Sequence, residues 1–143
     1  MRVIVTGGGG FLGRRLIDGL QNSGVQDIVV VEIAETDVPG CRVVQGDLAR
    51  DEILPELLAD EPCTIFHLAS VVSAGAEADW EHAVDQNLGG MLRLLEACRD
   101  SPHLHKVVFA STLAVFGGFT AGGEVGDLVK QTPSGTYGCL LYT

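Results

Sequence analysis

Five short apolar runs recur along the chain, and they are rich in the β-branched residues Val and Ile. They cover residues 2–6, 27–32, 42–45, 64–68 and 106–110. Between them, apolar residues recur at helical spacing over 14–20, 50–59 and 77–99. Strands that alternate with helices predict an α/β fold with a doubly wound parallel sheet and right-handed crossovers. At 143 residues, the chain is expected to form one domain, 1–143.

The longest predicted helix, over 77–99, has one apolar stripe that contains a polar residue. The stripe consists of Trp80, Val84, Asn87, Met91, Leu94, Leu95 and Cys98. An asparagine at a core position is either a hydrogen-bonded buried side chain or a group that holds backbone near a cofactor. Both interpretations of Asn87 remain open at this stage.

A glycine-rich turn follows the first predicted strand and precedes the first predicted helix. Its glycines fit two frames, 8-10-13 and 7-10-13. Glycine permits a tight turn and a close approach of backbone to a diphosphate, which the N-terminus of the following helix favours. Strand, turn and helix in this order are typical of a dinucleotide-binding unit. The residues expected to contact the cofactor are Gly7, Gly10, Phe11, Leu12 and Gly13.

An acidic residue ends the second predicted strand at the position where a ribose-binding carboxylate is expected. Glu32 lies 19 residues after Gly13, near the usual spacing of about 20. A carboxylate accepts hydrogen bonds from the ribose hydroxyls and repels a 2′-phosphate. No arginine follows Glu32 before Arg42, so NAD is favoured over NADP.

Composition narrows the classes of partner. The formal net charge of −10 argues against nucleic acid and anionic membranes. No segment has about 18 unbroken apolar residues, and a strand that begins at residue 2 argues against a signal peptide. We expect a cytoplasmic protein with reduced thiols and no metal site, because the cysteines and histidines lack ligand spacing.

The ends of the predicted strands locate the expected ligand site. Ligands of such sheets bind at the carboxyl ends of the strands. The residues at or just after these ends are Gly7, Glu32, Asp47, Ala69 and Ser111. After Gly117, glycines interrupt any periodicity up to Tyr137, which predicts a long irregular, functional loop.

These residues resemble the extended short-chain dehydrogenase/reductases of the NAD-dependent epimerase/dehydratase family. The opening glycine turn, Gly46-Asp47-Leu48, His67-Leu68-Ala69-Ser70, the segment from Ser111 to Gly117 and the segment from Thr132 to Gly138 are similar to its motifs in order. Within the family, the sequences of residues 68–73 and 113–118 most resemble a D-erythronate dehydrogenase-like, sugar-acid branch. The resemblance implies cofactor contacts from Asp47, Leu48, Leu68, Ala69, Ser70, Asn87, Ser111 and Tyr137, and substrate contacts from Ser73 and Thr112.

The resemblance also implies hydride transfer coupled to proton transfer on a small sugar acid or nucleotide sugar. Tyr137 takes the place of the general base and Thr112, which lies 25 residues earlier, that of the hydroxyl that orients the substrate. The family has a lysine four residues after the tyrosine, and here that position is Leu141. Leucine supplies no charge, so Tyr137 should remain a poor base and the chain should be inactive or nearly so. Dehydrogenase, epimerase and dehydratase chemistry all remain open.

Residues 139–143 have no likeness to the family. We therefore predict that the chain lacks the helix expected after Tyr137, the sixth strand and the substrate lobe. The Rossmann-type sheet should be truncated after about five strands. Residues 117–143 should form an irregular active-site loop with an aberrant C-terminus. A truncated product, a frameshift or a fragment would each explain this. A non-catalytic dinucleotide-binding module and a non-functional remnant are the alternatives to an enzyme. The strand at 106–110 should form an unprotected edge, through which the chain could form a homo-oligomer or aggregate.

Overall fold

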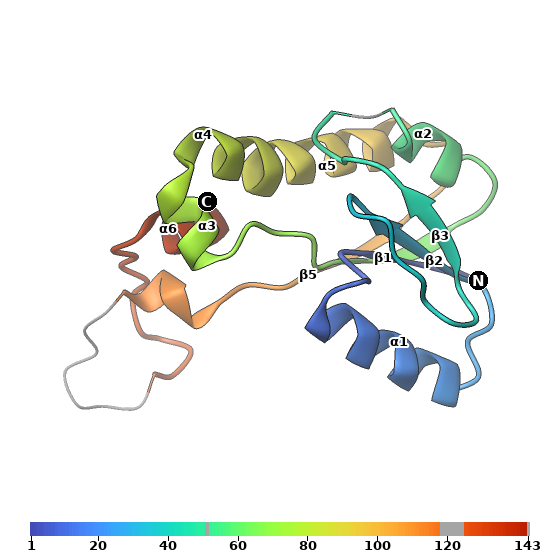
Figure 1. Ribbon diagram of the computed structural model, residues 1–143, viewed down its shortest axis with the longest axis horizontal. Helices are drawn as coiled ribbons and strands as arrows, with labels where there is room; N and C mark the ends of the chain where they lie inside the picture. The colour runs from blue at the N-terminus through green and yellow to red at the C-terminus, as the bar shows by residue number, and fades with distance from the viewer. Residues whose placement is uncertain (51, 118–124, 143) are drawn as a thin grey trace. The chain divides into compact units, whose positions relative to one another are not determined.

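The computed structural model describes residues 1–50, 52–117 and 125–142, and the chain divides into two compact units (Figure 1). The sheet unit comprises Met1–Ala69 and Gly90–Ala110, and the tyrosine unit comprises Ser70–Gly89 and Ser111–Thr143.

Five parallel strands form the sheet unit, in the order β3-β2-β1-β4-β5. The strands are β1 (Arg2–Thr6), β2 (Ile28–Glu32), β3 (Arg42–Gln45), β4 (Cys63–His67) and β5 (Lys106–Phe109). Each lies within one residue of its predicted bounds. The doubly wound α/β fold predicted from the sequence is therefore confirmed, with β3 and β5 at the two edges of the sheet.

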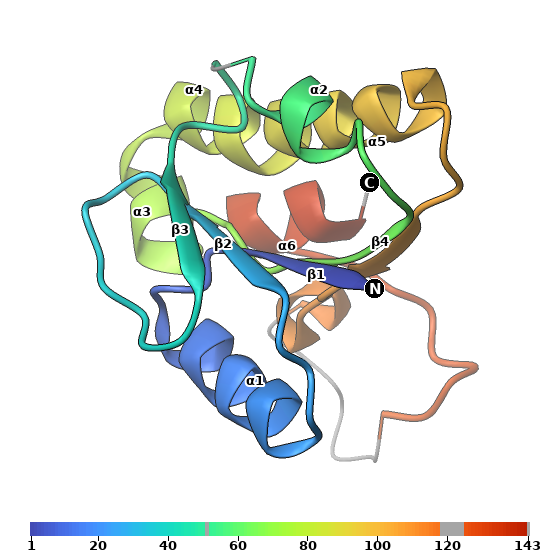
Figure 2. The same ribbon diagram turned by 90° about the vertical axis from the view of Figure 1, so that its right-hand side faces the viewer.

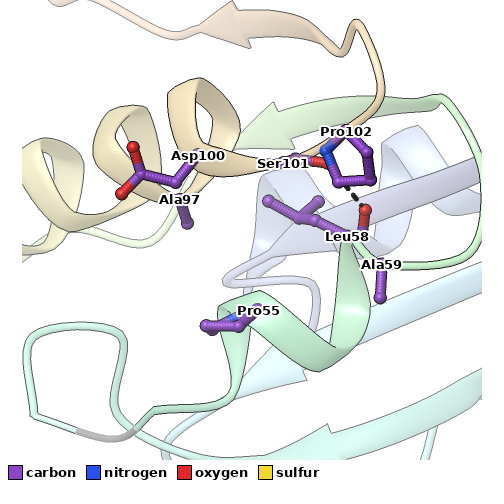
Figure 3. A pocket seen from close by; sticks show the side chains of 7 residues that line it. All are labelled: Pro55, Leu58, Ala59, Ala97, Asp100, Ser101 and Pro102. Atoms are coloured by element: carbon purple, nitrogen blue, oxygen red, sulfur yellow. Dashed lines mark hydrogen bonds between the residues drawn. The ribbon is translucent and has the colours of Figure 1, made fainter.

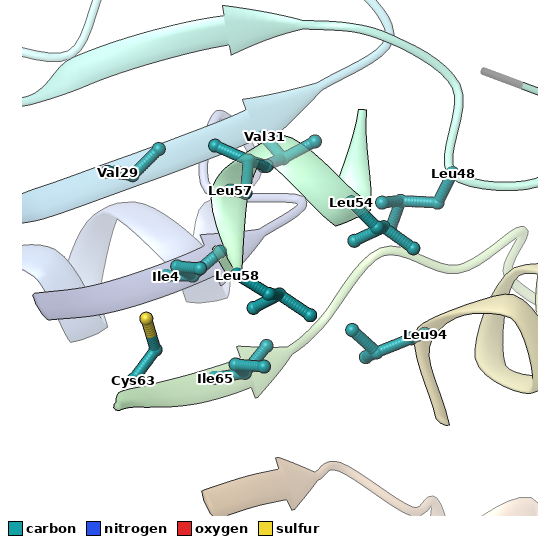
Figure 4. Packing of buried hydrophobic residues seen from close by; sticks show 10 residues of the cluster. All are labelled: Ile4, Val29, Val31, Leu48, Leu54, Leu57, Leu58, Cys63, Ile65 and Leu94. Carbon is teal, nitrogen blue, oxygen red and sulfur yellow. The ribbon is translucent and has the colours of Figure 1, made fainter. Parts of the chain in front are cut away.

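Helices cover both faces of this sheet, as Figures 1 and 2 show. Helix α1 (Phe11–Asn22) covers one face, and α2 (Leu54–Leu57) and α5 (Gly90–Asp100) cover the other. Successive strand residues point to opposite faces, so Val3 and Val5 pack in the cluster of α1, while Ile4 packs in the cluster of α2 and α5. Figure 4 shows the cluster of α2 and α5, in which the leucines of α2 face the valines of β2. Burial on both faces explains why the strands are continuous apolar runs.

The helices differ more from prediction than the strands do. The helix expected over 50–59 is regular only in α2, although its apolar face at 53, 54, 57 and 58 does pack into the core. The helix expected over 77–99 is correct from residue 80 onward, but it starts too early and misses a break at Asp79 and a π-helical segment. A separate helix, α3 (Ser73–Ala78), precedes the break, and α4 (Trp80–Ala83), the π-helix η1 (Val84–Gly89) and α5 then follow one another directly in the chain.

The interruption in that helical region occurs at Asp79. Its backbone is extended, and its carboxylate Oδ1 accepts a hydrogen bond of 3.0 Å from the backbone N–H of His82, so that it caps α4. An aspartate is a favoured N-cap residue, and here it begins a new helix within the apolar periodicity. Trp80 is consequently 55% exposed, and its predicted place in the buried stripe is wrong.

The tyrosine unit is built from α3, α4, η1, the 3₁₀-helix η2 (Leu113–Phe116) and α6 (Thr136–Tyr142). Ala76, Ala83, Val115, Leu140 and Leu141 form its buried apolar cluster. Part of the predicted irregular loop, 118–124, lies outside the described residues, and 125–135 has no helix or strand.

Helix α6 corrects the prediction that no helix follows Tyr137. The carboxylate of Glu77 accepts hydrogen bonds from the backbone N–H of Thr136 at 2.5 Å and from its hydroxyl at 3.1 Å, and so caps the helix. Leu140 and Leu141 then anchor α6 in the apolar cluster. The cap and the residues against which Leu140 and Leu141 pack come from elsewhere in the chain, so a sequence pattern around residue 137 could not reveal them.

Candidate cofactor and active site

The glycine turn of the sheet unit is closed so tightly that side chains are excluded at two positions. Gly7 has a positive φ of 69°, and a Cβ there would lie 2.7 Å from the backbone nitrogen of Ala69. A Cβ on Gly13 would lie 2.5 Å from the carbonyl oxygen of Gly7. The turn therefore packs against both the first turn of α1 and the segment after β4, as the dinucleotide-binding pattern requires.

The N-terminus of α1, unlike this packed turn, is accessible. Gly10 is the N-cap residue and has no side chain that could accept the N–H groups of the first turn. A Cβ on Gly10 would meet one atom within 4 Å, the carbonyl oxygen of Gly7 at 3.3 Å. Phe11 and Leu12 are 79% and 56% exposed. This combination of accessible N–H groups and a helix dipole is suited to an anion such as a diphosphate.

Glu32 reaches the glycine turn from the end of β2. Its Oε2 accepts a hydrogen bond of 3.1 Å from the backbone N–H of Gly9, and its Oε1 accepts one of 3.1 Å from the N–H of Ile33. The carboxylate therefore lies beside the turn in the place where the sequence pattern predicts the ribose-binding acid. Each oxygen keeps a free lone pair with which to accept a hydroxyl.

An arginine that was not among the predicted site residues also lies beside the glycine turn. Arg14, in the first turn of α1, donates from Nε to the carbonyl oxygen of Gly9 at 2.9 Å. Its terminal nitrogens donate to the Asp37 carbonyl oxygen at 3.2 Å and to Thr36 Oγ1 at 3.1 Å. NAD was predicted from the absence of arginine between Glu32 and Arg42, whereas the fold brings Arg14 from α1 to the loop after β2. An arginine in the first turn of a helix, where the dipole disfavours cations, was the available signal.

The segment after β4 is fixed by a buried polar pair. Thr6 Oγ1 accepts hydrogen bonds from the backbone N–H groups of Leu68 at 3.2 Å and Ala69 at 3.3 Å. It lies 2.8 Å from Nδ1 of His67, which is 2% exposed and stacks on the Phe109 ring. Burial lowers the pKa of His67 to about 4, so its imidazole is neutral near pH 7.

Two further candidates of the sheet unit have local roles. The Asp47 Oδ1 accepts a hydrogen bond of 2.9 Å from the backbone N–H of Ala49, and its Oδ2 lies 3.7 Å from Arg50 Nε. The Leu48 side chain is buried in the core beside α2 and α5. Any contact of Leu48 with a cofactor must therefore come from its backbone.

In the tyrosine unit, Asn87 holds the backbone that follows Ser70. Its Oδ1 accepts from the Val71 N–H at 2.7 Å and its Nδ2 donates to the Val71 carbonyl oxygen at 2.9 Å. Asn87 is therefore a hydrogen-bonded buried side chain that fixes the Val71 backbone. It lies in η1, and π-helical turns are frequent at functional sites. Ser73 begins α3, two residues after Val71.

The catalytic candidates of the tyrosine unit lie on two elements that pack together. Thr112 follows Ser111 and caps η2, with its Oγ1 accepting from the Ala114 N–H at 3.2 Å. Tyr137 lies in α6 and packs against the apolar cluster. Gly138 permits close packing, because a Cβ there would overlap the carbonyl oxygen of Ala114. Leu141 lies one helical turn after Tyr137, in the same cluster, and is 8% exposed.

A separate pocket of about 220 Å³ is formed by residues of α2 and α5 and of the segments that follow them. Figure 3 shows the side chains that line it. Its lining residues precede the starts of β4 and β5, so it opens near the amino ends of these strands. They are Pro55, Leu58, Ala59, Ala97, Asp100, Ser101 and Pro102. Among residues 1–50, 52–117 and 125–142, neither a group of three metal-ligating side chains nor a helix able to span a membrane was found.

A parallel sheet whose first strand leads into a glycine turn, with an acid at the end of the second strand, defines the class of Rossmann-type dinucleotide-binding proteins. Comparison with family models gives the membership. Residues 3–140 match the NAD dependent epimerase/dehydratase family, and the chain belongs to this family.

Curated relatives and solved structures agree with that assignment. The chain is 35% identical over 145 residues to a D-erythronate dehydrogenase of Haemophilus influenzae and 35% identical over 151 residues to one of Cupriavidus necator, covering 96% of this chain and 46% of each relative. It is 30% identical to the Thermus thermophilus UDP-glucose 4-epimerase in complex with NAD, with a TM-score of 0.88, covering 99% of this chain and 47% of that one. MoeE5 in complex with UDP-glucose and NAD is similar at 30% identity and a TM-score of 0.86, covering 99% and 46%. The chain thus spans about half the length of the relatives it matches.

Proposed function

We propose that this chain is the NAD-binding part of an NAD-dependent oxidoreductase or epimerase that acts on a sugar acid or a nucleotide sugar. The observation that carries the proposal is the Glu32 carboxylate, which is hydrogen-bonded to Gly9 within the tight glycine turn. The turn offers a place for the diphosphate, and the carboxylate offers acceptors for the adenosine ribose. The names of the relatives, two D-erythronate dehydrogenases and proteins in complex with UDP-glucose, support these substrate classes.

The remaining predicted site residues have complementary roles in the proposal. Leu68, Ala69 and Ser70, which follow β4, would contact the cofactor, and Ser111, which follows β5, would do the same. Asn87 would hold the backbone that follows Ser70. Thr112 and Ser73 would bind the substrate. NAD, when bound, supplies the hydride acceptor. Tyr137 would take the proton from the substrate hydroxyl.

Position 141 favours a second candidate function for this chain, a dinucleotide-binding module without catalysis. Leu141 is buried in an apolar cluster and places no charge beside Tyr137. An apolar neighbour gives no help to a phenol that must give up its proton to act as a base. We expect the chain to bind NAD and to transfer hydride weakly or not at all.

Calorimetric titration of the chain with NAD and with NADP tests the binding proposal. Tighter binding of NAD than of NADP is expected, because the Glu32 carboxylate repels a 2′-phosphate. Glu32→Gln should reduce that preference, since the amide keeps the shape and loses the charge. No binding of either dinucleotide, or tighter binding of NADP by the unaltered chain, contradicts the proposal.

A further inference from the structure

Arg14 occupies a position where a cation is unfavourable unless it has a specific role. It lies in the first turn of α1, and that turn contains no acidic residue. Its three acceptors are neutral oxygens, those of Gly9, Asp37 and Thr36. A rigid guanidinium can donate to several acceptors at once in a fixed geometry, which lysine cannot.

Two of these acceptors, the Gly9 peptide and Thr36, lie next to the Glu32 carboxylate. A Cβ built on Gly9 would lie 3.0 Å from Glu32 Oε2 and 3.1 Å from Thr36 Oγ1, so both groups meet at this glycine. The Gly9 peptide is held on both sides, because its N–H donates to Glu32 and its carbonyl oxygen accepts from Arg14. We propose that Arg14 is a positioning residue that holds the loop after β2 against the glycine turn and so preorganises Glu32 for the adenosine ribose. This inference rests on the proposed NAD binding.

The rest of the loop has anchors of its own. Gln21 Nε2, also from α1, donates to the Pro39 carbonyl oxygen at 2.8 Å, and Val38 is buried against α1. Loss of Arg14 should therefore leave the fold and the far end of the loop in place. Ile33 stays held by Gln45, whose Nε2 donates to its carbonyl oxygen at 3.1 Å. Only residues 34–37 should become mobile, and NAD must then order them again on binding.

The experiment compares NAD with the analogue that lacks the 2′-hydroxyl of the adenosine ribose, in calorimetric titrations of matched variants. Arg14→Ala should weaken NAD binding about tenfold and the analogue by much less, because the analogue cannot use the full Glu32 contact. Arg15→Ala is the matched control. It removes the same charge from the next position of α1, but Arg15 lies over the exposed Phe11 ring at 5.2 Å, so both affinities should stay unchanged.

Two more variants separate geometry from charge. Arg14→Lys keeps the charge without the fork and should behave like Arg14→Ala, whereas Thr36→Val removes one acceptor and should lose affinity for NAD in the same direction. Unchanged binding of NAD by Arg14→Ala, unchanged binding by Arg14→Lys, or an equal loss for NAD and the analogue overturns the inference alone. Failure of the unaltered chain to bind NAD overturns the proposed function, and this inference with it.

Discussion

The imidazole Nδ1 of His67 lies 2.8 Å from the hydroxyl oxygen of Thr6, across the paired ends of β4 and β1. Since that hydroxyl already accepts from two backbone N–H groups, its own hydrogen is donated to Nδ1. The neutral imidazole therefore carries its proton on Nε2, which is buried and has no hydrogen-bond partner among the described residues. Protonation of Nδ1 would break the contact with Thr6, so the pair should make folding sensitive to acid.

The first prediction follows from the pKa of His67, which burial lowers from 6.5 to about 4. Above pH 6.5 the histidine is neutral in both the folded and the unfolded chain. As the pH falls from 6.5 to 4, the unfolded chain binds the proton and the folded chain does not, so stability falls by about 3 kcal/mol from this group. Denaturant unfolding against pH measures the loss, and His67→Asn should lack this share of it. An NMR titration that gives His67 a pKa near 6.5 contradicts the prediction.

The second prediction concerns Gly10, where a side chain would enter the proposed diphosphate site. A Cβ at Gly10 meets only the Gly7 carbonyl oxygen, at 3.3 Å, so Gly10→Val should fold and fail to bind NAD in calorimetric titration. The control is Gly19→Ala in the same helix, where a Cβ meets no atom within 4 Å. It should keep NAD binding and stabilise the chain by about 0.5–1 kcal/mol. Normal binding of NAD by a folded Gly10→Val variant means that the glycine turn is not the diphosphate site.

The third prediction concerns the two hydrogen bonds between Asn87 and the Val71 backbone. Asn87→Leu keeps the approximate volume but leaves the Val71 N–H and carbonyl oxygen without these partners, which should destabilise folding by about 2–3 kcal/mol. Denaturant unfolding monitored by the fluorescence of Trp80, the only tryptophan, measures the change. His82→Ala, at an exposed position of α4, should change stability by less than about 0.5 kcal/mol. A loss below about 1 kcal/mol for Asn87→Leu would show that the contact contributes little.

The fourth prediction is that the chain transfers hydride weakly or not at all, and that Leu141→Lys restores little. Helix α6 would place a lysine one turn after Tyr137, so the geometry is present. The Leu141 side chain, however, is buried in an apolar cluster, and a lysine there should destabilise folding by several kcal/mol or lose its proton. Leu141→Met, which conserves volume, should cost less than about 1.5 kcal/mol. Strong NADH formation by the unaltered chain from a sugar acid or nucleotide sugar contradicts this prediction.

The features predicted correctly from sequence are those that depend on local spacing. Short apolar runs predict the strands, and fixed spacings between residues predict the glycine turn and the position of Glu32. Arg14 escaped prediction because its acceptors Thr36 and Asp37 lie 22 and 23 residues away. Helix α6 escaped because its cap, Glu77, is 59 residues away. The break at Asp79 was not predicted, because a polar residue between apolar helix positions can be either an N-cap residue or an exposed residue of a continuous helix.

The last prediction concerns the edge of the sheet at β5. This strand pairs with β4 on one side, and the order of the five strands places it at the edge of the described sheet. Val108 and Phe109 are 38% and 40% exposed there. Backbone N–H and carbonyl groups of alternate β5 residues point away from β4, and such an apolar edge promotes association.

We therefore expect the chain to be marginally stable and to self-associate through β5, which size exclusion with light scattering measures as a mass above that of one chain. Val108→Lys puts a charge on the edge and should shift the mass toward one chain, because edge lysines oppose strand pairing. Leu92→Lys is the matched control, since Leu92 is 52% exposed on α5 rather than on the sheet edge, and it should leave association unchanged. If Leu92→Lys dissociates the chains and Val108→Lys does not, association runs through the helix. A monomeric chain with a sharp unfolding transition at high temperature would show instead that the β5 edge is protected.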